Sequence, residues 1–272
     1  APMGLSVEEA AAAIIEVVNE NMAQAARMYV TERGGDIEGA AMVAFGGGGP
    51  LHAHQIAKKL GVREILIPEA AGVFSALGFL AAAPAYEVAR SRPMRLADVT
   101  AEGLAEIFAP LEEEADAIVA QAAPGAPIAH RRIAEMRYVG QGHQLRVPLD
   151  SLTPDAIGAA FSDTYRAAYG YAYDDLDPEI VTLRLSAVAD RAAAPVTGTA
   201  AATASDGTTR QAYDPVSRSM RDHRVIPFSA VTGTVEGPAL LTQPGATVLI
   251  GAGARARRDD GGWLSISLED LS

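Results

Sequence analysis

Four consecutive glycines, Gly46–Gly49, constrain the fold of this chain more than any other feature of its sequence. They follow a short apolar run over 40–45, the pattern of a strand that is covered on both faces. Pro50 comes next and suits the first turn of a helix, where its missing N–H is not needed. Gly61 suits the residue just past the end of that helix. The pattern therefore predicts a strand, a glycine loop and a helix over 50–60.

A glycine loop in this position suits a ligand. A backbone without side chains adopts positive φ freely and can approach another molecule closely. The unpaired N–H groups at the start of a helix also favour negative charge, which suits a nucleotide. A plain tight turn is the alternative, and one or two glycines would favour it. Four in a row favour a ligand loop.

Composition narrows the class of protein. The chain has 272 residues, of which 49% are apolar, enough for a large core and about two domains. It contains no cysteine, which excludes a thiol nucleophile, a disulfide or an iron–sulfur centre within these residues and fits a reducing compartment. The formal net charge of −12 argues against a nucleic-acid partner, because phosphate contacts need basic patches.

No targeting or membrane segment is expected. Residues 1–18 carry no early positive charge, unlike a signal peptide. The most apolar stretch, 65–83, is interrupted by Pro68, Glu69 and two glycines, whereas a membrane helix needs about 20 predominantly apolar residues. These features predict a cytoplasmic protein that binds no membrane.

The first third of the chain alternates helices and strands. Ser6 and Glu9 have the spacing of a capping box and predict a long helix over 7–33. The elements around the glycine loop follow, then a strand over 63–67 and a buried helix over 73–82. This α-β-α-β-α order favours a parallel or mixed sheet with helices on its faces.

The remainder predicts three further regions. Residues 191–211 are rich in Ala, Thr and Gly without an apolar period, which predicts a linker. Residues 212–272 hold short apolar runs broken by Gly and Pro turns, which predicts a small β-rich unit. Residues 93–190 predict an α+β domain with a helix over 101–122, two strands within 134–148, a helix over 154–168 and a strand over 179–189.

The first eighty residues resemble the closing portion of the actin, Hsp70 and sugar-kinase ATPase fold, in which a strand, glycines, a helix, a second strand and a small-residue helix follow one another. Residues 1–92 are accordingly assigned to the C-terminal part of such a lobe, in a chain of α/β plus α+β class. Five motifs narrow the resemblance to hydantoinase A, over most of residues 4–190: VNENMAQAARMYVTERG (18–34), AFGGGGPLHA (44–53), GVFSALGFL (72–80), RYVGQGHQL (137–145) and YGY (169–171).

This resemblance implies ATP as cofactor. The hydantoinase/oxoprolinase family includes N-methylhydantoinase, 5-oxoprolinase and the ATP-binding subunits of acetone and acetophenone carboxylases. In the superfamily the first glycines pack under the adenosine, which implies a nucleotide-binding role for Gly46, Gly47, Gly48 and Gly49. His52 matches the family's GGxGPLHA; it contacts a phosphate or a substrate carbonyl, or it supports the loop through a backbone hydrogen bond.

The resemblance also indicates what these residues lack. Family members carry a D-x-G-G-T-x-T-D phosphate loop, which is absent from this sequence, so the chain resembles the C-terminal part of a hydantoinase A subunit. Mg²⁺ and the phosphates would then be held mainly by residues outside it. The implied partners are an N-terminal hydantoinase A lobe, as a separate chain or a missing part, a hydantoinase-B-type subunit and a small-molecule substrate.

The implied reaction is phosphorylation of a carbonyl or enolate oxygen for hydrolysis of a cyclic amide. Two alternatives stay open: a subunit of an ATP-dependent ketone carboxylase, and an assembly subunit that binds no nucleotide itself. No catalytic residue and no metal ligand can be assigned, since neither a nucleophile elbow nor a P-loop is present.

Several polar residues near these motifs have two possible roles. His54 lies two residues beyond His52, so the two face apart on a helix and His54 is expected at the surface. Asn19 and Arg27, on the helix over 7–33, are expected to hydrogen-bond neighbouring backbone, with ligand contact as the alternative. Arg33 is expected in a structural ion pair with an acidic neighbour, with pairing to a nucleotide as the alternative.

The second half of the chain carries two departures from the family pattern and one aromatic motif. Gln144 and Tyr165 stand where family members usually carry Glu and often His, which argues against a metal or acid/base role there. Tyr169, Tyr171 and Tyr173 alternate, which predicts core packing or a partner interface.

Overall fold

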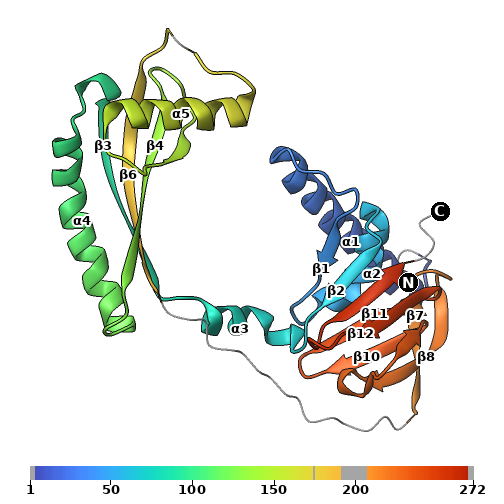
Figure 1. The fold of residues 1–272 in the computed structure, drawn as a ribbon. Coiled ribbons are helices and arrows are strands. Elements are labelled where there is room, and N and C mark those ends of the chain that lie inside the picture. Colours follow the sequence, from blue (N-terminus) through green and yellow to red (C-terminus); the bar gives the residue numbers. More distant parts are fainter. Residues whose placement is uncertain (1–3, 174, 191–206, 269–272) are drawn as a thin grey trace. The chain divides into compact units, whose positions relative to one another are not determined.

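The computed structural model describes residues 4–173, 175–190 and 207–268, which form two compact units of mixed helix and sheet (Figure 1). The first unit contains residues 4–80 and 207–268, and the second contains residues 81–190. None of the described helices combines the length and the apolar character needed to cross a bilayer.

The helices of the first unit begin where their capping residues predict. Helix α1 (Val7–Glu32) starts with the expected capping box, in which the Glu9 N–H donates to Ser6 Oγ at 3.1 Å and the Ser6 N–H donates to Glu9 Oε2 at 2.8 Å. Helix α2 (Gly49–Leu60) carries Pro50 in its first turn and ends at Gly61, whose φ of 77° lies in the left-handed region.

A five-stranded sheet in the first unit joins the two ends of the sequence. Its order is β1-β2-β13-β12-β9, with β1 and β2 parallel and the remaining pairs antiparallel. Ile266 on β13 lies opposite Ile65 on β2, and both side chains are fully buried. The strands are β1 (Ala41–Val43), β2 (Glu64–Ile67), β9 (Thr234–Glu236), β12 (Ala254–Arg258) and β13 (Leu264–Leu268).

A second sheet completes this unit, in the order β11-β10-β8-β7. Helix α2 packs on β11, and apolar side chains from both ends of the sequence enter one core, among them Ala57, Ile65, Val248 and Ile250. The strands are β7 (Thr209–Asp214), β8 (Ser219–Pro227), β10 (Ala239–Gln243) and β11 (Ala246–Ile250).

This shared core differs from the predicted domain organisation. The boundary falls after Leu80 and not after residue 92, and the strands expected to form a separate unit over 212–272 belong to the first unit. Short strands bury their apolar faces only against another layer, and local sequence does not tell which layer that is. Of the predicted linker over 191–211, residues 191–206 lie outside the described residues, and the last three belong to β7.

The second unit is an antiparallel sheet in the order β3-β6-β4-β5, with two helices packed on it (Figure 1). Leu104 and Phe108 of α4 and Ile157 and Phe161 of α5 enter its core. The elements are β3 (Ala85–Arg95), α4 (Ala101–Ala122), β4 (Ile128–Tyr138), β5 (Leu145–Pro148), α5 (Pro154–Tyr169) and β6 (Pro178–Ala189).

Two elements of the chain differ from their sequence patterns. Strand β3 was not predicted, because Arg90, Arg92 and Pro93 break its apolar pattern; Pro93 lies where the register with β6 shifts, so its missing N–H is tolerated. Helix α3 (Phe74–Ala81) was expected to be buried, but it contains no buried residue, and Phe79 is 85% exposed. Apolar composition alone therefore gave the wrong burial for α3.

The pairing of β2 with β13 predicts that the last described strand stabilises the first unit. We expect Ile266→Ala to reduce the free energy of unfolding by about 2–5 kcal/mol, as removal of a buried isoleucine does. Hydrogen exchange followed by mass spectrometry should report the loss of protection in α2 and β2 as well as in β13. Val216→Ala, at an exposed apolar residue of the same unit, is the control. Unchanged protection in β2 would contradict the shared core.

Candidate functional site

The glycine loop is fixed at its beginning by backbone hydrogen bonds. The Ala44 N–H donates to the carbonyl of Leu66 at 2.9 Å, which continues the pairing of β1 with β2. Gly46 then has a φ of 87°, in the left-handed region where glycine is favoured. Its N–H donates to the carbonyl of Ala71 at 2.7 Å. The loop is thereby held against the turn that precedes α3.

Three turns of the first unit meet at this place. A Cβ atom on Gly72 would lie 2.7 Å from the carbonyl oxygen of Gly245, in the turn between β10 and β11, and one on Gly47 would lie 3.3 Å from the same oxygen. The Ala71 N–H also donates to Gln243 Oε1 at 3.2 Å. Position 72 therefore needs glycine because a larger side chain would not fit against the backbone at Gly245. The sequence alone did not identify Gly72, Gln243 or Gly245 as residues that shape the loop.

The second half of the loop is open. A Cβ atom on Gly48 or Gly49 would meet no atom within 4 Å. Across the described residues, the N–H groups of Gly47, Gly48 and Gly49 have no hydrogen-bond partner, and Gly48 caps α2 without a side-chain hydrogen bond. Free N–H groups at the start of a helix attract negative charge. The start of α2 therefore combines three free N–H donors with open space beside them.

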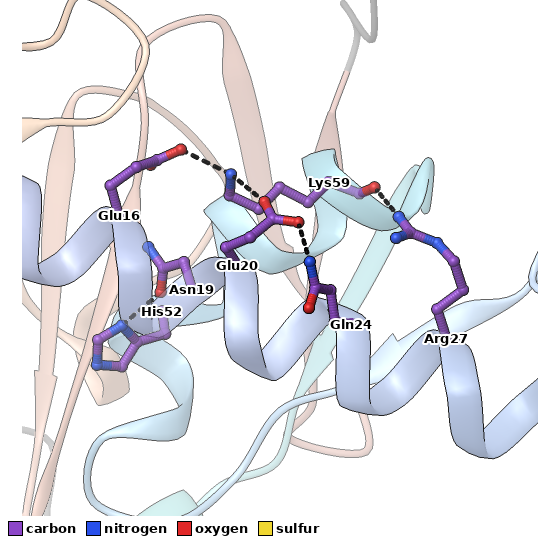
Figure 2. A network of polar contacts seen from close by, with 7 residues as sticks. All are labelled: Glu16, Asn19, Glu20, Gln24, Arg27, His52 and Lys59. Atoms are coloured by element: carbon purple, nitrogen blue, oxygen red, sulfur yellow. Dashed lines mark hydrogen bonds and ion pairs between the residues drawn. The ribbon is translucent and has the colours of Figure 1, made fainter.

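His52 contacts helix α1 and not the loop backbone. Its Nδ1 lies 2.7 Å from Oδ1 of Asn19, a residue that is buried in α1 (Figure 2). An amide oxygen only accepts, so Nδ1 of the neutral ring carries the proton and Nε2 keeps a lone pair. Asn19 therefore hydrogen-bonds a side chain, whereas backbone was expected. His52 could accept a hydrogen bond from a ligand through Nε2.

A polar network next to His52 fastens α1 to α2 (Figure 2). Lys59 Nζ lies 2.6 Å from Glu16 Oε1 and 2.9 Å from Glu20 Oε2. These hydrogen bonds raise the pKa of Lys59, and the one from Lys59 holds the pKa of Glu20 below its ordinary value. Arg27 Nη2 donates to the Lys59 carbonyl at 2.7 Å, the backbone contact expected for that residue. The network therefore fastens the last turn of α2 to α1, whereas the contact between His52 and Asn19 fastens the first turn.

His54 is buried, so its predicted surface position was wrong. The ring packs against Gly251, where a Cβ atom would lie 2.6 Å from His54 Cε1. His52 and His54 do point to different faces of α2, as expected. The face that carries His54 is covered by β11 and the turn after it. Burial lowers the pKa of His54; the nearby Asp214 carboxylate opposes this effect and Lys58 adds to it.

The other sequence candidates, Arg33, Gln144 and Tyr165, have surroundings of their own. Arg33 stacks on Tyr29, with its guanidinium carbon 3.6 Å from the ring centroid, and forms no ion pair within the described residues. In the second unit Tyr165 is buried and accepts a hydrogen bond from Gln141 Nε2 at 2.9 Å. Gln144 is exposed. Gln144 and Tyr165 thus belong to the second unit, whereas the glycine loop belongs to the first.

The tyrosine motif forms an aromatic cluster. Tyr171 and Tyr173 have ring centroids 5.2 Å apart, and Tyr138 lies 5.4 Å from Tyr173. Tyr138 is buried, whereas Tyr169, Tyr171 and Tyr173 are partly exposed. The three tyrosines of the motif thus belong to a cluster of rings around the buried Tyr138, and each of them is also exposed to solvent. Within the described residues no three His, Asp or Glu side chains gather in a group that could hold a metal ion.

Comparison with known proteins assigns the class. Residues 1–88 match the sequence model of the hydantoinase/oxoprolinase family. The chain is 31% identical over 197 residues to caprolactamase subunit alpha of Pseudomonas jessenii, over 69% of this chain and 28% of that protein. It is 28% identical over 202 residues to the acetone carboxylase beta subunit of Xanthobacter autotrophicus, over 66% of this chain and 27% of that protein.

A solved structure agrees with this assignment. The crystal structure of ATP-dependent caprolactamase from Pseudomonas jessenii superposes with a TM-score of 0.71 and 26% identity, over 99% of this chain and 41% of that one. The chain belongs to the hydantoinase/oxoprolinase family. It spans about a quarter of the length of the curated relatives named above.

Substitution by alanine should destabilise the protein at the packed glycine, Gly72, and leave its stability almost unchanged at the open glycine, Gly48. We expect Gly72→Ala to reduce the free energy of unfolding by about 1–3 kcal/mol, because its Cβ would overlap the backbone at Gly245. Gly48→Ala should change it by less than about 0.5 kcal/mol, because the site is open and φ is −98°. Guanidinium denaturation measures both, and equal losses would contradict the geometry.

Burial of His54 predicts an acid-sensitive first unit. The unfolded chain takes up a proton at His54 near the ordinary pKa of 6.5, whereas the folded chain does so only at lower pH. The free energy of unfolding should therefore fall as the pH drops through 6.5 towards the lower folded pKa. Thermal denaturation between pH 7.5 and 5 should show a weaker pH dependence in His54→Phe. His143→Phe, at an exposed histidine, should behave as wild type; parallel profiles for all three proteins would exclude the effect.

Proposed function

We propose that this chain supplies the adenosine side of an ATP site in an enzyme of the hydantoinase/oxoprolinase family. The observation that carries the proposal is the start of α2, where three free N–H groups, Gly47 to Gly49, border open space. A nucleotide carries acceptors and negative charge, both of which such a helix start favours. His52 Nε2, with Nδ1 bound to Asn19, supplies one acceptor for a hydroxyl or amino group of the nucleoside.

The first unit is, in this proposal, the C-terminal part of an actin/Hsp70-like ATPase lobe. The order of α1, β1, the glycine loop, α2, β2 and α3 supports it, as does the similarity to a protein described as an ATP-dependent caprolactamase. Mg²⁺ and the β- and γ-phosphates are, in this proposal, held by polypeptide outside this chain.

The proposed reaction is phosphorylation of a carbonyl or enolate oxygen, which turns a poor leaving group into a good one. Hydrolysis of a cyclic amide is the first candidate, supported by the higher identity to caprolactamase subunit alpha. ATP-dependent carboxylation of a ketone is the second, supported by the match to the acetone carboxylase beta subunit. Both relatives are named as subunits, which supports partner chains, here an N-terminal lobe and a hydantoinase-B-type subunit.

Substrate-stimulated ATP hydrolysis distinguishes the two reactions. The assembled enzyme is incubated with ATP and either caprolactam, 5-oxoproline or a hydantoin, or with acetone and bicarbonate, and phosphate release is followed. Stimulation by a cyclic amide supports the hydrolase, and stimulation that needs both ketone and bicarbonate supports the carboxylase. A chain that serves only in assembly would leave the ATP affinity of the complex insensitive to changes at Gly48.

A substitution at Gly48 tests the nucleotide site directly. We expect Gly48→Asp to weaken ATP binding by the assembled enzyme at least tenfold, because a carboxylate at the start of α2 would occupy the open space and repel phosphate. Gly142→Asp adds the same charge at an open glycine of the second unit and is the matched control. Isothermal titration calorimetry measures both dissociation constants; equal values would overturn the nucleotide assignment.

A further inference from the structure

Helix α1 leaves most of its surface uncovered. Only Asn19 and Ala23 of its 26 residues are buried. Large apolar side chains are nevertheless exposed along its whole length: Val7 (82%), Ile14 (65%), Val17, Val18, Met22, Met28 and Tyr29. Single exposed apolar residues are ordinary, but a contiguous row of them marks an interaction surface.

Most of the exposed apolar residues form one stripe, and Val17 and Met28 lie outside it. Val7, Ala11, Ile14, Val18, Met22, Ala25 and Tyr29 follow one another at spacings of three and four, the period of a single helix face. The stripe runs from Val7 to Tyr29, 23 residues with a rise of about 33 Å at 1.5 Å per residue. A second stripe, with Glu16, Asn19 and Ala23, faces α2 and holds the polar network (Figure 2). The mean directions of the two stripes lie about 130° apart at 100° per residue, so α2 leaves the first one free.

The sheet beside this helix is also incomplete at one edge. Strand β1 pairs with β2 alone among the described strands, so its other edge is open. Val43 on β1 and Phe45 beyond it are both exposed. An open edge and an uncovered helix face within one unit indicate that another layer of polypeptide completes it.

We propose that the apolar stripe of α1 is covered by polypeptide that corresponds to the part of the relatives' chains not matched here. The solved caprolactamase chain is more than twice as long as its superposed region, since this chain covers 41% of it. Such a segment can be apolar along one side, because it is itself buried in the contact. This inference rests on the proposed function in one respect only: the covering segment is the lobe that would hold the phosphates.

A second copy of this chain fits the stripe less well. Each copy carries a formal net charge of −12, so two copies repel one another. Glu8 and Glu32 lie beside the two ends of the stripe on the same helix, which in a pairing of two such helices adds further like charge. The covering segment is therefore expected to differ from this chain and to carry Lys or Arg beside its apolar residues.

Photo-cross-linking in the intact assembly tests the proposal. p-Benzoylphenylalanine is placed at Ile14 or at Met22, and in a control at Val216, an exposed apolar residue of the turn between β7 and β8. After irradiation without nucleotide, mass spectrometry identifies the peptides joined to each position. From positions 14 and 22 we expect peptides that lie outside residues 1–272 and align with the unmatched part of caprolactamase subunit alpha.

Every other result overturns the proposal. Peptides from residues 1–272 of a second molecule would make the stripe a self-association surface. Yields at positions 14 and 22 no higher than at position 216 would make it a solvent-exposed face. Because the cross-links form without ATP, they report docking alone. The two proposals can therefore fail separately. If the expected cross-links are absent while Gly48→Asp still weakens ATP binding, only the docking proposal fails. If the cross-links form as expected while Gly48→Asp leaves ATP binding unchanged, only the nucleotide proposal fails.

A charge substitution provides the second measurement. Ile14→Asp combined with Val18→Asp should lower the melting temperature of the assembly by several degrees relative to Val216→Asp, because aspartate cannot be buried in an apolar contact without a partner. Circular dichroism of residues 1–272 should show equal helix content in both variants, since both positions on α1 are exposed. An unchanged melting temperature of the assembly would contradict docking at this stripe.

Discussion

The antiparallel pairing of β2 with β13 is the interaction on which the first unit depends. It places Ile65 and Ile266 opposite one another in the core, although about 200 residues separate them in the sequence. The same arrangement brings the turn at Gly245 against Gly72, and the Ala71 carbonyl then anchors Gly46. The shape of the glycine loop is therefore set by strands that come from the other end of the chain.

This dependence divides the glycines into two groups with different physical roles. Gly46 and Gly72 serve the fold, one through its positive φ and the other through close approach of two backbones. Gly48 and Gly49 serve no packing contact, and free N–H groups lie beside the space that they leave. The run of four glycines is thus a structural element at its beginning and a candidate ligand surface at its end. The contact of His52 with Asn19 adds an oriented ring nitrogen at the same helix start.

Local patterns predicted the helices and several strands well, because each depends on neighbouring residues. The capping box at Ser6, Pro50 near the start of α2 and Gly61 at its end all occupy their expected positions. Burial was predicted less well. His54 and α3 were each given the opposite environment, because exposure depends on which element covers a residue. Strand β3 was missed since Pro93 interrupts its pattern at a point where a register shift tolerates it.

The sequence by itself determined most of the order of elements, the glycine loop and the family, because these follow from residue type and short-range spacing. Tertiary structure alone decided that residues 207–268 complete the first unit, that Gly72, Gln243 and Gly245 shape the loop and that His54 is buried. It also decided that one stripe of α1 stays uncovered. Each of these facts rests on a contact between residues far apart in the sequence, and short-range spacing carries no record of such contacts.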